Sequence, residues 1–200
     1  KIIRDPLNPL NGTVNFLDNL GAVIGSLTFI NIEYIVSCFT PGTMITTQSG
    51  PVAIEALQPG DLVATRDHGL QPVRWIGARR FGAAELVSDP TLQPILIRKG
   101  ALGEGLPLVD MRVSRQHRML MTGPRAELLF GTDEVLVRAA HLLCLPGVSA
   151  EKASEVTYLH VLFDRHEVVL ADGSWSESFQ PGDRSMAGME AEQRAELLKI

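Results

Sequence analysis

The sequence predicts an all-β fold built from many short strands. Apolar and β-branched runs of roughly four to eight residues are separated by turn residues, and the 200-residue chain contains 18 Gly and 12 Pro. Apolar residues make up 45% of the chain and the mean hydropathy is +0.11, which is typical of a sequence that folds around a buried core. One segment near the end, residues 189–198, is rich in good helix formers, so we expect a short, partly helical tail.

The first part of the chain predicts a β-hairpin. Residues 13–17 and 22–30 have the composition of strands, and residues 18–21 between them carry the chemistry of a tight turn. Because this hairpin precedes Cys38, we assign residues 1–37 to a leader segment.

The β pattern continues after Cys38. Residues 77–93 predict irregular structure, with the basic pair Arg79-Arg80 in a solvated loop. Residues 139–143 predict a single helical turn before the Pro146-Gly147 turn. The strands that we expect are residues 43–46, 52–57, 60–65, 73–76, 94–98, 108–113, 117–122 and 135–137.

Charge and motifs exclude several classes of function. The net charge is −5 and no Lys/Arg cluster exceeds two consecutive residues, so nucleic acid is not an expected partner. No apolar run reaches the ~18 residues of a membrane-spanning helix. No metal-ligand motif is present, and we expect neither a metal nor a cofactor. Cys144, the second of the two cysteines, follows two leucines and predicts a core position, whereas His141 predicts a surface position.

Three blocks of sequence carry the strongest functional signal. The first is residues 36–43, VSCFTPGT; the second is residues 114–117, SRQH, which lead into an apolar run; the third is residues 158–173. In this order and at this separation, the blocks resemble the Hint domain of hedgehog autoprocessing domains and inteins, and in particular a bacterial hedgehog/intein-like subfamily. The resemblance implies a horseshoe of short strands with pseudo-twofold halves over residues 38–178, followed by a tail over residues 179–200.

The resemblance also implies the chemistry of the first two blocks. The thiol of Cys38 would attack the carbonyl carbon of Ser37, so that the Ser37–Cys38 peptide bond is exchanged for a thioester. The departing amide nitrogen needs a proton, and His117 is the expected donor. Ser114 stands where the family has the hydroxyl of its Thr/Ser-x-x-His motif, and it would hydrogen-bond the same peptide.

The third block offers further candidates. His160 is the proton carrier near the place where inteins have an assisting Asp or Cys, although strand alternation also allows a buried structural histidine beside Tyr158 and Leu162. Asp164 and His166 lie farther along the block. Together with Thr43 in the first block, these residues complete the candidate set.

Two departures from the family narrow the expected reaction. Asn31 is the last Asn of the chain, so no Asn can cyclise at a downstream junction, where Glu177 and Ser178 stand instead. Residues 76–80 contain no Asp of the kind that hedgehog domains use, and the tail is too short and polar for a sterol site. We therefore expect thioester formation followed by attack of water or of an external thiol or amine.

The sequence as a whole predicts a single-turnover autoprotease that acts on its own N-terminal segment. Because Lys1 is not an initiator methionine, we expect a piece of a larger exported bacterial protein, at the cell surface or outside the cell. The alternative is a catalytically quiet Hint fold with a structural or binding role. A cysteine hydrolase acting on other proteins is disfavoured, because Cys38 directly follows the segment that would be released.

Overall fold

The computed structural model describes residues 2–4, 12–17, 23–29 and 37–180. The chain divides into two compact units, residues 1–34 and 35–200. The first contains an antiparallel three-stranded sheet of β1 (Ile2–Arg4), β2 (Gly12–Leu17) and β3 (Val23–Phe29). The β2–β3 pairing confirms the predicted strands of the hairpin, while its turn at residues 18–21 lies outside the described residues. Strand β1 was not expected.

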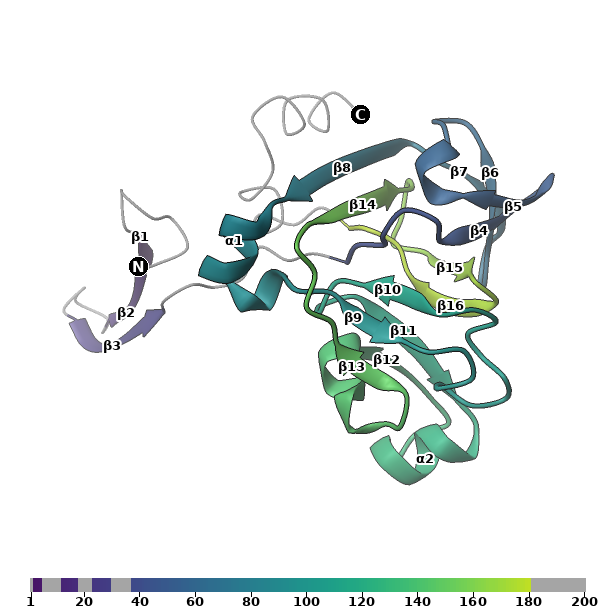
Figure 1. Ribbon diagram of the computed structural model, residues 1–200. Coiled ribbons are helices and arrows are strands. Elements are labelled where there is room, and N and C mark those ends of the chain that lie inside the picture. Colours follow the sequence, from purple (N-terminus) through teal and green to yellow (C-terminus); the bar gives the residue numbers. More distant parts are fainter. Residues whose placement is uncertain (1, 5–11, 18–22, 30–36, 181–200) are drawn as a thin grey trace. The chain divides into compact units, whose positions relative to one another are not determined.

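The second unit is built around a sheet of eight short strands (Figure 1). Seven follow the order β12-β11-β16-β15-β4-β6-β7, β5 pairs with β4, and all pairings are antiparallel. The strands are β4 (Met44–Thr47), β5 (Gly50–Ala53), β6 (Leu62–Thr65), β7 (Gly69–Pro72), β11 (Arg118–Thr122), β12 (Glu134–Arg138), β15 (Val168–Ala171) and β16 (Ser174–Glu177).

Two smaller groups of strands complete this unit. Strands β10 (Met111–Val113), β9 (Ile95–Ile97) and β13 (Val148–Ala150) form a three-stranded sheet. Strands β8 (Trp75–Phe81) and β14 (Val156–Leu162) form a two-stranded ribbon, paired along all seven residues of each (Figure 1). Phe39 joins the two groups, because its backbone bridges Val113 of β10 and Leu159 of β14.

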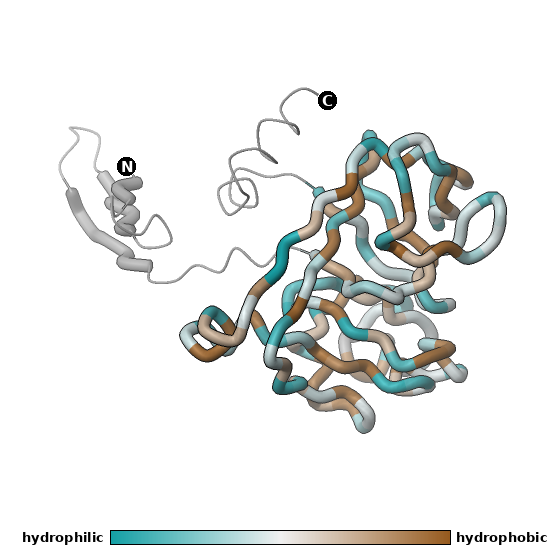
Figure 2. The backbone as a smooth tube through the Cα atoms, turned by 45° about the horizontal axis from the view of Figure 1, so that its top comes forward, coloured by the Kyte–Doolittle hydropathy of each residue, from teal (hydrophilic) through white to brown (hydrophobic). Residues whose placement is uncertain are grey.

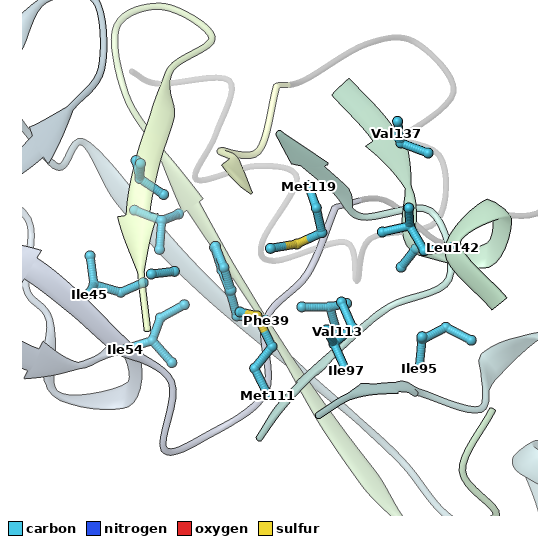
Figure 3. Close-up of a cluster of buried hydrophobic side chains, with 14 of the residues drawn as sticks. Phe39, Ile45, Ile54, Ile95, Ile97, Met111, Val113, Met119, Val137 and Leu142 are labelled. Carbon is cyan, nitrogen blue, oxygen red and sulfur yellow. The ribbon is translucent and has the colours of Figure 1, made fainter. Parts of the chain in front are cut away.

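The largest hydrophobic core lies around the Phe39 side chain (Figure 3). Ile45 and Ile54 pack on one side of it, and residues of the smaller sheet and of β11 pack on the other. Brown apolar positions alternate with teal polar ones along many strands of this unit, as Figure 2 shows. Burial of Phe39, which is 2% exposed, fixes the backbone of its neighbour Cys38 within the fold.

The helices of the second unit are short. They are α1 (Ala83–Ser88), α2 (Pro124–Phe130), and the 3-10 helices η1 (Ile54–Ala56), η2 (Pro90–Leu92) and η3 (Ala139–Cys144). Of these, only η3 matches a predicted helical turn. Segments of three to seven residues are too short to display an amphipathic period, so α1 and α2 depend on local end signals instead. At the start of α1 the Glu85 carboxylate accepts a hydrogen bond from the Gly82 amide. Helix α2 begins at Pro124 and is capped at its C-terminus by Gly131, which adopts the left-handed conformation.

Three sequence predictions are wrong. Residues 77–93 are not irregular: β8 continues to Phe81, where the Arg79-Arg80 pair lies on a strand, and α1 and η2 follow. The expected strand over residues 52–57 breaks after Ala53, because buried Ile54 turns the chain into η1. Cys144 is exposed, since the turn of η3 directs Leu142 inward in its place.

The structure confirms the mostly β class, with little helix. The pseudo-twofold halves remain a prediction, and the expected tail helix at residues 189–198 lies outside the described residues. Within the described ranges, no helix is long and apolar enough to cross a membrane.

Candidate functional site

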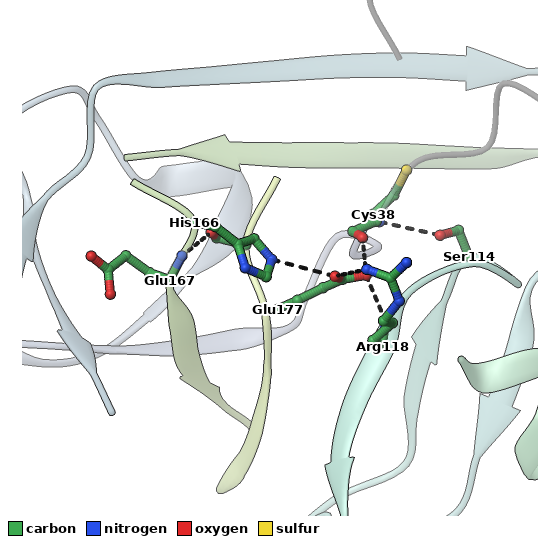
Figure 4. A network of polar contacts seen from close by, with 8 residues as sticks. Cys38, Ser114, Arg118, His166, Glu167 and Glu177 are labelled. Carbon is green, nitrogen blue, oxygen red and sulfur yellow. Dashed lines mark hydrogen bonds and ion pairs between the residues drawn. The ribbon is translucent and has the colours of Figure 1, made fainter. Parts of the chain in front are cut away.

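Cys38 is held between two strands that come from distant parts of the sequence. Its carbonyl accepts a hydrogen bond from the Ser114 amide at 3.0 Å, and the next residue, Phe39, exchanges two backbone hydrogen bonds with Leu159 of β14. The side chain is 2% exposed, and its sulfur points toward the β8–β14 ribbon (Figure 4). The Ser37–Cys38 peptide therefore has a fixed position and a buried thiol beside it.

The Ser-x-x-His spacing produces a tight turn. The His117 amide donates to the Ser114 carbonyl at 3.1 Å, which closes a four-residue turn just before β11. The hydroxyl oxygen of Ser114 accepts the Cys38 N–H at 3.2 Å. One short motif thus brings a hydroxyl to the nitrogen of the candidate scissile bond.

His160 reaches the other side of the same peptide from β14. Its Nδ1 lies 3.2 Å from the Ser37 carbonyl oxygen and 3.4 Å from Cys38 Sγ, and its Nε2 lies 3.7 Å from Sγ. Nδ1 can accept a proton from the thiol or donate one to the carbonyl, but it cannot do both at once. The sequence left open whether His160 is a buried structural residue. It is buried, and it also contacts the Cys38 sulfur and the Ser37 carbonyl oxygen.

Aromatic packing around Gly77 holds the imidazole in place. Gly77 of β8 lies directly opposite His160 in the ribbon. A Cβ on Gly77 would lie 1.9 Å from the Trp75 indole, so that only glycine leaves room for this ring. Phe179 packs against both Trp75 and His160, with ring centroids 6.2 and 5.1 Å away. Substitution of Gly77 would therefore disturb the support of His160.

Burial sets the protonation of the thiol and of His160. Burial raises the pKa of the Cys38 thiol and the negative charge of Glu177 adds to this rise, whereas a hydrogen bond from Ser114 opposes it. Burial lowers the pKa of His160 to about 4. The hydrogen bond to the Ser37 carbonyl favours the charged imidazolium and opposes this decrease. At neutral pH the thiol is protonated and the adjacent imidazole is neutral, which is the pairing that a base-assisted attack requires.

His117 lies in a different environment. Its side chain is 0% exposed, and neither ring nitrogen has a hydrogen-bond partner among the described residues. The ring packs against Phe39 in a T-shaped contact with centroids 4.4 Å apart. Burial lowers the pKa of His117 to about 4; Glu177 acts to raise it, and His160 and Arg118 act to lower it further. At neutral pH the His117 ring is thus neutral, and within the described ranges both of its nitrogens lack a hydrogen-bond partner.

Glu177, at the end of β16, is a site residue whose role the sequence did not indicate. Its carboxylate is 2% exposed and accepts hydrogen bonds from the Ser37 hydroxyl and from the Arg118 amide, the latter at 3.0 Å. Arg118 Nη1 lies 2.8 Å and His166 Nε2 3.4 Å from its second oxygen (Figure 4). Burial acts to raise the pKa of Glu177, but these donors and the nearby His117 hold it below its ordinary value. Only its place in the junction-like stretch after the third block singled it out in the sequence.

The remaining candidates lie away from the Ser37–Cys38 peptide. Asp164 is exposed and forms an ion pair with Arg74. His166 contacts Glu177, not the peptide. The Thr43 hydroxyl donates to the Thr40 carbonyl at 2.9 Å and stabilises the turn after Cys38. Across the described ranges, no three His, Cys, Asp or Glu side chains gather as a metal site.

Comparisons with known proteins complete the description of the site. Residues 37–183 match the family model described as "Hint domain". A bacterial intein-like domain from Clostridium thermocellum is 20% identical, with a TM-score of 0.49, over 72% of this chain and 98% of that one. The gp41-1 intein is 12% identical, with a TM-score of 0.42, over 70% and 97%. A DnaB intein from Synechocystis sp. PCC 6803 is 12% identical, with a TM-score of 0.42, over 71% and 98%. No curated protein matches the chain.

Proposed function

The chain belongs to the Hint domain family, a family of autoprocessing domains, and from that premise we propose that it cleaves its own Ser37–Cys38 peptide bond. The proposed reaction is an N-to-S acyl shift that gives a thioester, followed by attack of water or of an external thiol or amine. It takes place once per chain and uses residues 1–37 as its substrate. Neither Asn-dependent splicing nor transfer to a sterol is part of the proposal.

A single observation carries this proposal: three side chains converge on one peptide bond. Ser114 contacts the amide nitrogen, His160 contacts the carbonyl oxygen, and the Cys38 thiol lies within reach of the same imidazole. An amide is difficult to break because resonance strengthens its C–N bond. Groups at the nucleophile, at the oxygen and at the nitrogen are what its cleavage requires.

His160 is the proposed base for the first step. Its neutral Nδ1 takes the thiol proton, and the sulfur adds to the Ser37 carbonyl carbon. The same Nδ1–H then lies 3.2 Å from the oxygen that becomes negative, and it can donate a hydrogen bond to that oxyanion. A single ring nitrogen thus has two consecutive tasks, which accounts for its position between the sulfur and the oxygen.

The second step breaks the bond between the Ser37 carbonyl carbon and the Cys38 nitrogen. The nitrogen leaves as an amine, and we propose that His117 supplies its proton while the Ser114 hydroxyl holds it in place. The negative charge of Glu177 offsets only part of the effect of burial, and the pKa of His117 stays at about 4. His160 then releases the thiol proton to solvent and His117 regains one from solvent, so both rings return to their starting state. In net terms one proton moves from sulfur to nitrogen, and the acyl group moves from nitrogen to sulfur.

The acceptor of the acyl group is proposed to be external. Hydrolysis of the thioester gives residues 1–37 with a terminal carboxylate and residues 38–200 with an N-terminal cysteine. A small thiol gives a thioester of Ser37 instead, and an amine gives an amide. Dithiothreitol should therefore accelerate cleavage in proportion to its concentration, and cholesterol should change neither the rate nor the products.

Intact-mass measurement of freshly purified protein, with and without dithiothreitol, tests the proposal. We expect two masses that divide the chain between residues 37 and 38, with fragment 1–37 carrying the added thiol. Cys38→Ala should abolish cleavage, and Cys144→Ala, which removes the other cysteine, should leave it unchanged. Cleavage that persists in Cys38→Ala contradicts the mechanism. A single mass that is stable under thiol favours the quiet structural role, and a sterol-sized mass gain contradicts the proposed acceptors.

A further inference from the structure

The Ser37 side chain has a partner of its own at the other end of the second unit's sequence, to which Ser37 also belongs. Its hydroxyl donates to Glu177, a residue 140 positions away in the sequence. This contact is separate from the contacts of Ser114 and His160 with the peptide bond itself. It therefore concerns which residue stands before the cleavage point, not how the bond is broken.

The Glu177 carboxylate is not free to turn away from residue 37. The Arg118 amide binds the same oxygen that accepts the Ser37 hydroxyl, and the Arg118 guanidinium and His166 bind the other. The strand positions of Arg118 and Glu177 are themselves fixed, since β11 pairs with β16 through Met119 and Ser176. A buried carboxylate oxygen is thus held toward the side chain of residue 37.

From this arrangement we propose that Glu177 determines specificity by selecting a hydrogen-bond donor at the residue before the scissile bond. An ionised carboxylate only accepts hydrogen bonds, so it matches the hydroxyl of Ser or Thr. An apolar side chain would leave a buried carboxylate lacking one donor, and an acidic side chain would add a second negative charge. This assignment rests on the proposed cleavage between Ser37 and Cys38.

The Glu177 carboxylate also affects the release of the product after hydrolysis. Hydrolysis of the thioester creates a new carboxylate on Ser37, the residue whose side chain Glu177 holds. Two negative charges on groups that contact the same residue repel each other in a poorly solvated site. Glu177 thus binds residue 37 before cleavage and favours the departure of the hydrolysed product.

Cleavage rates of residue 37 variants of the full chain test the proposed role of Glu177. Thr and Val have nearly the same shape, so Ser37→Thr and Ser37→Val isolate the hydroxyl. We expect Ser37→Thr to cleave near the parent rate, and Ser37→Val to be about tenfold to a hundredfold slower than Ser37→Thr, as for a lost hydrogen bond to a charged group. Ser37→Asp should be slowest, and adding Glu177→Gln should restore part of its rate, because an amide can donate to the new carboxylate. Equal cleavage rates for Ser37→Thr and Ser37→Val overturn the proposal. A slow rate of Ser37→Asp that Glu177→Gln does not raise also overturns it.

A second measurement separates this proposal from the proposed function. In the uncleavable Cys38→Ala chain, the melting temperatures of Ser37→Val, Glu177→Gln and the double variant report the contact without any reaction. The double variant should lose less than the sum of the two single losses. If the losses of melting temperature in the two single variants add up to the loss in the double variant, the proposed contact is wrong. A parent chain that never cleaves while the two positions remain coupled contradicts the proposed function alone.

Discussion

Two buried histidines, His160 on β14 and His117 before β11, differ in the contacts that their rings make. Burial lowers the pKa of each to about 4. His160 has hydrogen-bond contacts to the thiol and to the Ser37 carbonyl. His117 has an aromatic contact with Phe39, and its two nitrogens have no hydrogen-bond partner in the described part of the chain.

His160 and His117 are both buried but make different contacts, so burial alone does not assign a role to a histidine. The contacts of His160 commit it to the sulfur and to the oxygen, where the reaction begins. Unsatisfied buried nitrogens are costly, and a neutral imidazole with both nitrogens unpaired can take up a proton at one and give one up at the other. We therefore assign His160 to the attack and His117 to the departure of the nitrogen.

The largest expected effect comes from removing His160. His160→Ala deletes both the base and the oxyanion donor, so the rate of dithiothreitol-dependent cleavage should fall by at least roughly 10³-fold. The rate is measured from the appearance of fragment 1–37 by mass spectrometry. Circular dichroism of the same sample checks that the fold persists. A folded His160→Ala chain that cleaves within about tenfold of the parent would reverse our assignment of the two histidines.

Removal of His117 should have a smaller but clear effect. His117→Ala should slow cleavage about 10²-fold, the lower end of the range for general acid catalysis, because Ser114 still holds the nitrogen. Ser114→Ala is the matched comparison, and we expect it to cost about tenfold, since it removes one hydrogen bond. A larger loss in Ser114→Ala than in His117→Ala would mean that the hydroxyl, not the imidazole, governs departure of the nitrogen.

Acidification should destabilise the fold through both histidines. Each has a pKa near 6.5 when unfolded and about 4 when folded, so the unfolded chain binds more protons between these values. Stability is then complete above pH 6.5 and is lost as the pH falls toward 4, by about 3 kcal/mol per histidine. Melting temperatures of the Cys38→Ala chain across this range measure the loss. Adding His117→Ala should flatten the curve, and an unchanged slope would contradict a neutral buried His117.

The smallest expected effect comes from Asp164. Asp164 forms an ion pair with Arg74 on the surface, where the Asp164 side chain is 59% exposed, whereas both histidines are buried. Asp164→Asn should therefore change neither the cleavage rate nor the melting temperature measurably. A clear loss of cleavage at constant stability would return this residue to the site and weaken the division between two histidines.

Local patterns predicted much of the fold and several residues of the site. The hairpin strands, most strands after Cys38 and η3 follow from short apolar runs and turn residues, which act over a few positions. The Ser114–His117 spacing also acts locally, since a four-residue turn brings its ends together. Helices α1 and α2 were missed because six or seven residues are too few to display a helical period, and Cys144 was misplaced because a single turn decides which side chain faces inward.

By itself, the sequence determined a mostly β chain with a thiol, a hydroxyl and two histidines in recognisable blocks. The tertiary structure decided which of these groups meet. Strand β14 is buried on both faces, so alternation could not say whether His160 faces the core or the peptide; the pairing with β8 and the bridge to Phe39 decided it. The meeting of Ser37 with Glu177 likewise depends on the register of β11 with β16. Such contacts join residues far apart in the chain, and only the packed fold sets their distance and removes the water between them.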